Sequence, residues 1–188
     1  MYWKHSEFLD HSTADEYLDI FKYHVEWIND DPISNCRFVH KWTPSLSSNI
    51  IDKIINNLID KLKDECHITN CYCVIFNNYF NGNDYCPYYK NICETDVYTV
   101  SLGTSRDMLI KKNERGQRSD KILLESGDLY YMSEEMNKHY KHSIPKRKNV
   151  KDTRISIVFF CNTSEDETLH PPICDCWNCE EERKENNS

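Results

Sequence analysis

The chain has 188 residues, which suits one domain, and its 39% hydrophobic and 12% aromatic residues are enough to build a core. Its formal net charge of −8 argues against a general nucleic-acid coat protein, although it permits a local basic patch. No apolar run reaches the roughly 20 residues of a membrane helix, and the first residues lack the apolar core of a signal peptide, so we expect no membrane association.

Two helices are predicted in the first third of the chain. Residues 12–15 (Ser-Thr-Ala-Asp) resemble a capping box, and apolar residues follow at helical spacing as far as Ile28, before Asp30, Asp31 and Pro32 end the helix. A second helix is predicted over 45–62, where a wide apolar face lies opposite Asp, Lys and Asn. Such a face is typical of a helix that packs along a sheet.

After Cys66 the apolar residues alternate, as they do in strands. Strands are predicted at 71–76, 97–102, 107–111, 121–124, 129–132 and 155–160, separated by turn residues such as Asn81-Gly82-Asn83 and Ser126-Gly127-Asp128. Helices followed by many short strands predict an α+β fold in which helices buttress a sandwich or barrel. We divide the chain into a folded domain, 1–164, and a polar cysteine-bearing tail, 165–188, whose end we expect to be disordered.

Three segments carry chemistry in a fixed order. The first, residues 77–91, reads N-N-Y-F-N-G-N-D-Y-C-P-Y-Y-K-N, and the second, 100–108, reads V-S-L-G-T-S-R-D-M. The third combines S-G-D-L-Y-Y-M at 126–132, H-S-I-P at 142–145 and R-I-S-I-V-F-F at 154–160.

Together these segments resemble the AlkB-type iron(II)/2-oxoglutarate dioxygenases. That family has N-x-Y-x-x-G-x-D-x-I-x-x-H-x-D, then V-S-L-G-x-x-R-x-F, then S-G-D-L-x-x-M, H-S-x-P and R-x-x-L-T-F-R. The resemblance covers about residues 70–160 and implies a double-stranded β-helix, or jelly-roll, core.

The same resemblance places the three iron ligands at positions 89, 91 and 142. The family's iron needs two His and one carboxylate, but this chain has Tyr89, Asn91 and His142. Asn is a weak neutral donor, and Tyr must first lose a proton whose pKa is ordinarily near 10. We therefore expect little iron binding and interpret the chain as an inactive dioxygenase homologue, a pseudoenzyme retained for a binding or structural role.

The positions that the resemblance assigns to 2-oxoglutarate are better retained. Asn77 and Tyr79 match the pair that contacts the cosubstrate, Arg154 matches the arginine that binds its distal carboxylate, and Ser156 stands where many members have Asn. Phe160 replaces the last arginine of the family pattern. Losing that arginine together with the ligand carboxylate is chemically coherent, because a buried arginine without its anion is costly. We keep 2-oxoglutarate as an expected ligand.

Structural roles are the alternative for each retained residue. Tyr79 would then serve packing, His142 would be a hydrogen-bonded core histidine, and Arg154 would pair with a core carboxylate. A shifted register with Glu94 or Asp96 as the iron carboxylate would break the match of the first segment. As a function, the alternative is a divergent active dioxygenase that demethylates nucleic acid or protein. An unrelated cupin-like binding domain is a third reading.

The cysteines suggest a second site. The ten thiols of a chain without a signal peptide favour a reducing intracellular compartment, the cytoplasm or nucleus. In the tail, His170, Cys174, Cys176 and Cys179 have the spacing of a structural zinc site, with a loose reduced tail as the alternative. Cys71 and Cys73, two apart on a strand, are expected to face the same way as core thiols.

The sequence gives less information on the binding partner and on the source organism than on the fold. Basic clusters at 111–121 and 146–154 are either solvated loops or nucleic-acid contacts, so the expected partner is a protein or a nucleic acid that the sequence does not identify. The abundance of Asn, Ile, Lys and Tyr suggests an AT-rich genome, such as that of a large DNA virus or a protist, so the protein is possibly viral.

Overall fold

A computed structural model describes residues 2–29, 37–43, 49–91, 95–114 and 116–162. Their elements follow the chain in this order: β1 (Tyr2–His5), α1 (His11–His24), β2 (Ile28–Asn29), β3 (Phe38–Trp42), α2 (Ile50–Cys66), β4 (Asn70–Tyr79), β5 (Cys86–Tyr89), β6 (Asp96–Gly103), β7 (Arg106–Lys112), β8 (Asp120–Leu124), β9 (Leu129–Met132), α3 (Glu134–His139), β10 (Tyr140–Ile144) and β11 (Arg154–Asn162). No helix among them is long and apolar enough to cross a membrane.

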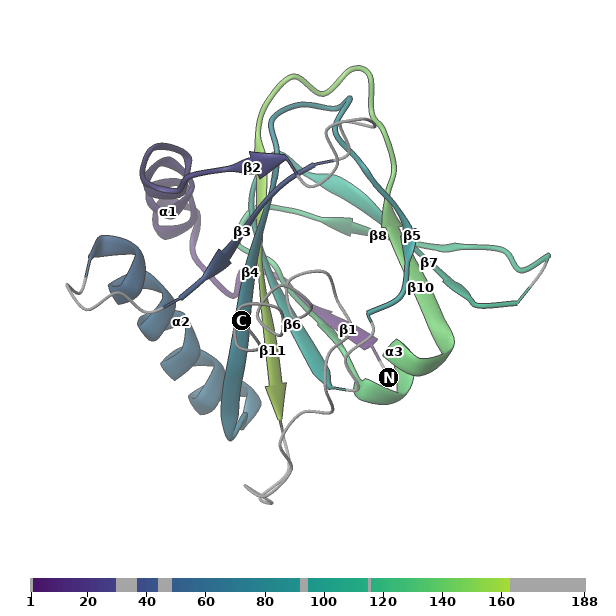
Figure 1. The fold of residues 1–188 in the computed structure, drawn as a ribbon, viewed down its shortest axis with the longest axis horizontal. Helices are drawn as coiled ribbons and strands as arrows, with labels where there is room; N and C mark the ends of the chain where they lie inside the picture. The colour runs from purple at the N-terminus through teal and green to yellow at the C-terminus, as the bar shows by residue number, and fades with distance from the viewer. Residues whose placement is uncertain (1, 30–36, 44–48, 92–94, 115, 163–188) are drawn as a thin grey trace, which may run out of the picture.

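The strands form two antiparallel sheets that face each other (Figure 1). The larger sheet has seven strands in the order β1-β9-β6-β11-β4-β3-β2, and the smaller has four in the order β5-β10-β7-β8. Helices α1 and α2 cover the outer face of the larger sheet (Figure 1). The predicted α+β class with a double-stranded β-helix buttressed by helices is confirmed.

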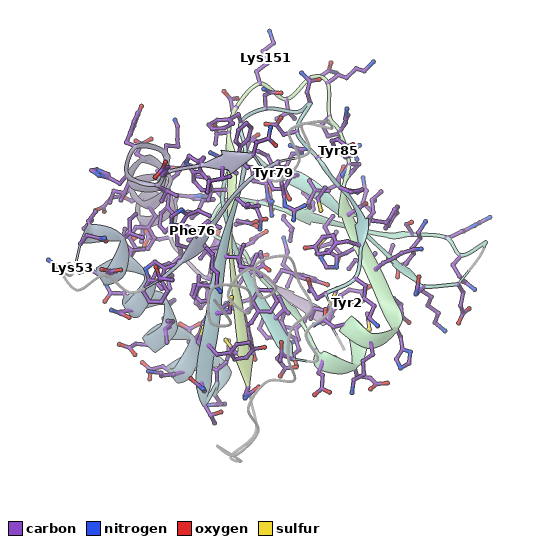
Figure 2. All side chains as sticks on the ribbon, viewed as in Figure 1. Tyr2, Lys53, Phe76, Tyr79, Tyr85 and Lys151 are labelled. Carbon is purple, nitrogen blue, oxygen red and sulfur yellow. The ribbon has the colours of Figure 1, made fainter. Side chains whose placement is uncertain are left out.

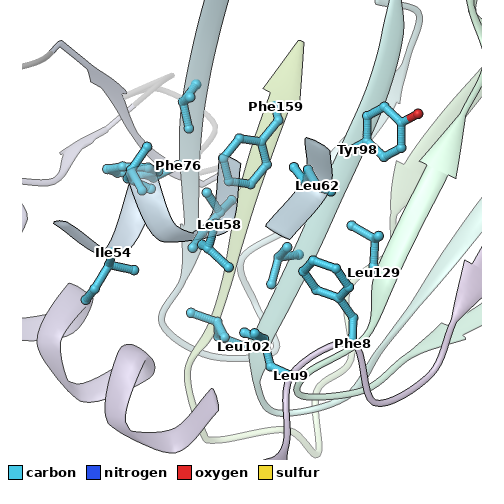
Figure 3. Close-up of a cluster of buried hydrophobic side chains, with 14 of the residues drawn as sticks. Phe8, Leu9, Ile54, Leu58, Leu62, Phe76, Tyr98, Leu102, Leu129 and Phe159 are labelled. Atoms are coloured by element: carbon cyan, nitrogen blue, oxygen red, sulfur yellow. The ribbon is translucent and has the colours of Figure 1, made fainter. Parts of the chain in front are cut away.

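The larger sheet is buried on both faces, as the alternation along β11 shows. Ile155, Ile157 and Phe159 point into the core beneath the helices, whereas Arg154 and Ser156 point between the sheets. The helix-side core joins Leu58 and Leu62 of α2 to aromatic and aliphatic side chains of the sheet (Figure 3). One strand can therefore build the core with one face and a site with the other.

The helices begin and end differently from their prediction. The N-cap of α1 is Asp10, whose carboxylate accepts a hydrogen bond of 3.0 Å from the backbone N–H of Thr13, so the predicted capping box at 12–15 is wrong. The helix ends at His24, and Ile28 already belongs to β2. Helix α2 begins at Ile50 after a capping box between Asn49 and Asp52, and the predicted start near residue 45 lies outside the described residues.

All six predicted strands are present, but five others were not predicted: β1, β2, β3, β5 and β10. These are short, and their His, Lys and Tyr residues hide the apolar alternation.

A bulge in β4 shows that the expectation for Cys71 and Cys73 is wrong. Cys71 pairs with Cys161 and Cys73 with the neighbouring Phe160, so the extra residue Tyr72 turns the two thiols to opposite faces of the sheet.

Candidate functional site

A small cavity of about 40 Å³ lies between the two sheets. It is lined by Asn77, Tyr79, Tyr89, Asn91, Val97, Thr99, Met108, Leu124, Tyr130, Met132, His142, Ile144, Arg154, Ser156 and Val158. Every position predicted to contact iron or 2-oxoglutarate is in this lining. Phe160 does not line the cavity and belongs to a small cluster with Val97.

Strand register explains why the four predicted cosubstrate residues meet. Strands β4 and β11 are neighbours in the larger sheet, and their pairing sets Asn77 opposite Ser156 and Tyr79 opposite Arg154. The Asn77 amide nitrogen donates to the Ser156 hydroxyl at 3.3 Å. Two cross-strand pairs on one face thus form one wall of the cavity.

Arg154 is the buried charge of this wall. Only 2% of it is exposed, and its Nη2 donates to the hydroxyl of Ser101 at 3.0 Å. Within the described residues its Nε has no hydrogen-bond partner, and no carboxylate forms an ion pair with it. Burial lowers the pKa of the guanidinium, an effect that the nearby Tyr79 opposes. The alternative that Arg154 pairs with a core carboxylate finds no support in these contacts.

Tyr79 lies between two arginines and points into the space between the sheets (Figure 2). Its ring centroid is 5.4 Å from the guanidinium carbon of Arg154 and 5.5 Å from that of Arg106. Burial raises the pKa of Tyr79 to about 12, so the phenol stays protonated at neutral pH. Arg106 donates to the carbonyls of Asp84 and Pro145 at 2.9 and 2.8 Å and so has a structural role.

The opposite wall holds the predicted iron positions. Tyr89 of β5 pairs in register with His142 of β10, and their ring centroids are 4.3 Å apart. Burial, with a smaller contribution from Arg37, lowers the pKa of His142 to about 4, so its imidazole is neutral. The Asn91 amide nitrogen donates to the side-chain oxygen of Asn137 in α3 at 3.1 Å.

These residues do not fit a ferrous ion. A tyrosine phenol, a neutral amide held by Asn137 and one imidazole replace the two imidazoles and a carboxylate that such an ion needs. Across the described ranges no group of three or more His, Cys, Asp or Glu side chains could hold a metal. Asp96, the alternative carboxylate, does not line the cavity and instead accepts from the backbone N–H of Glu134 at the start of α3. Glu94 lies outside the described residues.

Arg37 is a site residue that the sequence analysis missed. Its Nε donates to the side-chain oxygen of Asn77 at 2.8 Å, and its Nη1 lies 2.9 Å from the sulfur of Cys86. Its guanidinium carbon is also 5.5 Å from the ring centroid of Tyr89. Arg37 therefore bridges the two sheets beside the iron positions. The sequence offered little signal for it, because Phe-Val-His-Lys-Trp of 38–42 does not alternate between apolar and polar residues, and only the pairing of this strand with β4 brings Arg37 next to Asn77.

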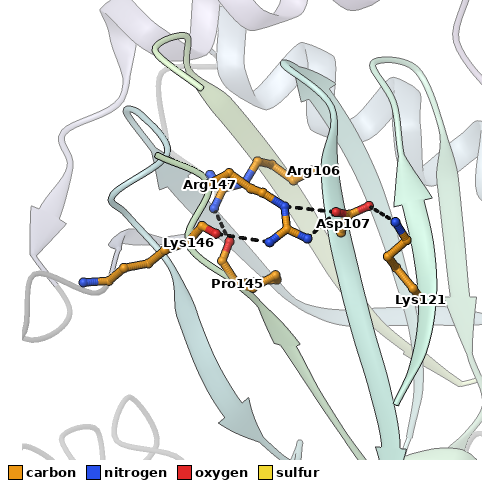
Figure 4. A network of polar contacts seen from close by, with 6 residues as sticks. All are labelled: Arg106, Asp107, Lys121, Pro145, Lys146 and Arg147. Carbon is orange, nitrogen blue, oxygen red and sulfur yellow. Dashed lines mark hydrogen bonds and ion pairs between the residues drawn. The ribbon is translucent and has the colours of Figure 1, made fainter. Parts of the chain in front are cut away.

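Two basic residues of the loop 145–153 contact neighbouring strands and turns. Arg147 forms an ion pair with Asp107, which also contacts Lys121 at 3.6 Å (Figure 4). Lys146 lies 4.5 Å from the ring centroid of Tyr85. The predicted zinc ligands His170, Cys174, Cys176 and Cys179 lie outside the described residues.

Comparison with known protein families shows to which family the chain belongs. A family model described as the 2OG-Fe(II) oxygenase superfamily matches residues 55–159. The chain belongs to this superfamily. The match contains every residue that lines the cavity, whereas Arg37 lies outside it. The family's description specifies 2-oxoglutarate and iron as its cofactors.

Individual relatives agree with this assignment. The chain is 29% identical over 98 residues to the DNA oxidative demethylase ALKBH2 of Bos taurus, covering 46% of this chain and 35% of that protein. It is 28% identical over 127 residues to an uncharacterized protein of Acanthamoeba polyphaga mimivirus, covering 62% of this chain and 59% of that one. The matches thus span about a third and three fifths of these relatives. The resemblance to AlkB-like 2-oxoglutarate oxygenases is confirmed.

Solved structures support the fold alone. A Pseudomonas putida prolyl-4-hydroxylase superposes with a TM-score of 0.58 at 9% identity, covering 87% of this chain and 93% of that one. A 2OG-Fe(II) oxygenase-family oxidoreductase from Burkholderia pseudomallei gives a TM-score of 0.60 at 12% identity, covering 87% and 84%.

Proposed function

We propose that this AlkB-like protein has given up the family's iron chemistry and binds a small dicarboxylate, of the kind of 2-oxoglutarate, at Arg154. The observation that supports the proposal is a buried guanidinium with one hydroxyl partner and an unpartnered Nε in a cavity between the sheets. A buried charge is costly unless an anion and hydrogen bonds offset its desolvation. A carboxylate that accepts two N–H bonds from Arg154 would do both.

The ligand is tested by titration calorimetry with 2-oxoglutarate in the presence of a chelator. We expect Arg154→Gln to weaken binding by about tenfold or more, because the charge-assisted bonds are lost. Arg118→Gln is the matched control, since it removes the same charge from an exposed position outside the cavity. Equal binding by Arg154→Gln and the native protein would contradict the proposal.

The loss of iron chemistry is tested separately by anaerobic titration of the native protein with ferrous iron and 2-oxoglutarate. A visible charge-transfer band with stoichiometric iron would refute the proposal. We expect no such band, because only His142 offers the family's donor.

A divergent active dioxygenase that demethylates nucleic acid or protein is the second candidate. It is favoured by the similarity to a DNA oxidative demethylase and by the retained Asn77, Tyr79, His142 and Arg154. The charge-transfer band of bound iron and 2-oxoglutarate, together with succinate release when a methylated substrate is added, would establish this activity.

The proposal also covers the cysteine-bearing tail, 165–188, and a macromolecular partner. We infer that His170, Cys174, Cys176 and Cys179 bind one structural zinc, and metal analysis of the purified chain tests this. Absence of zinc together with free thiols at these cysteines would rule the site out. We also propose that the protein binds a macromolecular partner, either a protein or a nucleic acid. Binding to such a partner should be measured with 2-oxoglutarate present.

A further inference from the structure

Asn137 of α3 is a buried amide behind one of the predicted iron positions. Only 1% of it is exposed, and its side chain contacts both ends of the segment 91–95. Its nitrogen donates to the backbone carbonyl of Thr95 at 2.8 Å, and its oxygen accepts from the side-chain nitrogen of Asn91 at 3.1 Å. Asn137 does not line the cavity, whereas Asn91 does, so Asn137 acts on the site through Asn91.

The backbone fixes the direction of these two hydrogen bonds. The carbonyl oxygen of Thr95 can only accept, so the nitrogen of the Asn137 amide has to face it. The planar amide then directs its oxygen toward Asn91. An acceptor at that place requires a donor, which Asn91 supplies through its N–H group. Turning the Asn137 amide over would set two oxygens against each other at Thr95.

Helix α3 holds Asn137 in this place. The N–H of Glu134 donates to the carboxylate of Asp96 at 2.8 Å, which ties the start of the helix to the start of β6. Within the helix, the N–H of Asn137 donates to the carbonyl of Ser133 at 3.0 Å. Because the backbone of Asn137 is fixed, any side chain at position 91 meets the same amide oxygen.

We propose that Asn137 makes the iron position at 91 specific for a neutral amide, so that this position does not accept the carboxylate that a ferrous ion requires. A carboxylate has acceptor oxygens and no N–H, so Asn91→Asp would set an oxygen against that of Asn137. Two buried acceptors without a hydrogen between them lose a hydrogen bond and repel each other.

Asn137 is in this view a positioning residue, since it touches the cavity only through Asn91. The inference rests on the part of the proposed function in which iron chemistry is lost, and it does not involve the dicarboxylate. It implies that rebuilding the family's ligands at 89 and 91 is not sufficient to rebuild the metal site.

The first test compares the cost of Asn137→Ala in three backgrounds of the metal-free protein: native, Asn91→Ala and Asn91→Asp. Urea unfolding at neutral pH measures each midpoint. The loss of midpoint should be largest in the native chain, where the bond to Asn91 is broken. It should be smaller in Asn91→Ala, where no bond exists, and smallest in Asn91→Asp, where the change also removes an opposing oxygen. Equal losses in the last two backgrounds, or a larger loss in Asn91→Asp, would overturn the inference.

The second test measures cobalt(II) binding by absorption in a chain that carries Tyr89→His and Asn91→Asp. These changes, with His142, rebuild the donors that the family uses. We expect weak cobalt binding in this chain, and adding Asn137→Ala should tighten binding by about tenfold or more, because the carboxylate is released from the opposing oxygen. Asn57→Ala, at an exposed position of α2, is the matched control and should change cobalt affinity less than about twofold. Cobalt binding that is equally tight with and without Asn137→Ala would contradict the inference.

The outcomes separate the inference from the proposed function. Neither of these tests contains ferrous iron or a dicarboxylate, so the order of midpoints and the cobalt affinities decide the inference. A charge-transfer band in the native protein, or no binding of 2-oxoglutarate, overturns the proposed function. Equal midpoint losses in Asn91→Ala and Asn91→Asp, together with native dicarboxylate binding, overturn the inference alone.

Discussion

At the scale of single residues, environment rather than residue type decides what each cavity side chain does. Arg106 and Arg154 are both almost fully buried and both flank Tyr79. Arg106 donates to the backbone carbonyls of Asn81, Asp84 and Pro145, whereas Arg154 donates to the Ser101 hydroxyl, and the Nε of each has no partner among the described residues. Arg106 therefore holds backbone segments together, whereas Arg154 lines the cavity, where an anion could reach it.

His142 makes the stability of the protein depend on pH. Its pKa is lowered from the ordinary 6.5 to about 4, so between these values the unfolded chain binds a proton that the folded one does not. Stability contributed by the neutral imidazole is complete above pH 6.5, falls as the pH falls, and is fully lost below about pH 4. Denaturant unfolding at pH 7 and pH 5 should differ by about 2 kcal/mol from this group alone. In His142→Asn that contribution should vanish. An unchanged pH dependence in the variant would contradict the lowered pKa.

At the scale of elements, the turn between β4 and β5 is held against the loop that precedes β11. Gly82 donates to the Val150 carbonyl at 2.8 Å and accepts from the Arg147 N–H at 2.7 Å. A Cβ at Gly82 would overlap the Arg147 carbonyl. This contact fixes where β11 begins, and so where Arg154 enters the cavity.

Gly82→Ala should therefore destabilise the fold by about 2–4 kcal/mol, because backbone atoms have to move. Gly116→Ala is the control: its φ of 77° carries a backbone cost of about 1 kcal/mol, but no atom lies within 4 Å of the added Cβ. Urea unfolding of both variants measures the difference. A smaller loss for Gly82→Ala than for Gly116→Ala would show that the loop yields easily.

The bulge in β4 brings two thiols together. Cys71 and Cys161 are paired residues of β4 and β11, and a hydrogen bond from the Cys161 thiol lowers the pKa of Cys71. Paired residues of antiparallel strands are about 4.5–5.5 Å apart at Cα, within the range of a disulfide. We expect a diazene oxidant, which takes two electrons and two protons from the thiols, to join Cys71 to Cys161. Peptide mass spectrometry detects the link, and its absence under conditions that oxidise other thiols would refute the expectation.

At the scale of the whole molecule, stability and ligand binding are on opposite faces of one sheet. The helix-side core includes the fully buried Leu58, whereas the cavity lies between the sheets. Figure 1 shows α2 on the side of the larger sheet away from the smaller one.

Leu58→Ala should thus lower the free energy of unfolding by about 2–5 kcal/mol through the cavity it leaves. Affinity for 2-oxoglutarate should change less than about twofold, since Leu58 belongs to the helix-side core and does not line the cavity. Thermal unfolding and calorimetry on the same sample check both statements. A tenfold loss of affinity would mean that the helix layer and the cavity are coupled.

The amino-acid sequence by itself determined the fold class and most of the site. Alternation of apolar residues located six strands, and the ordered motifs placed Asn77, Tyr79, His142 and Arg154 in one cavity. Local periodicity and short motifs are written in neighbouring residues, so they can be recognised without knowing which strands pair.

Only the tertiary structure placed Arg37 beside the site. Arg37 is 40 positions from Asn77, and nothing local links them. Their contact depends on β3 pairing with β4, and β3 has too little apolar alternation to predict. Likewise the bulge at Tyr72, which separates Cys71 from Cys73, exists only as a mismatch between two paired strands. Contacts between distant segments follow from strand register, and register is a property of the assembled sheet.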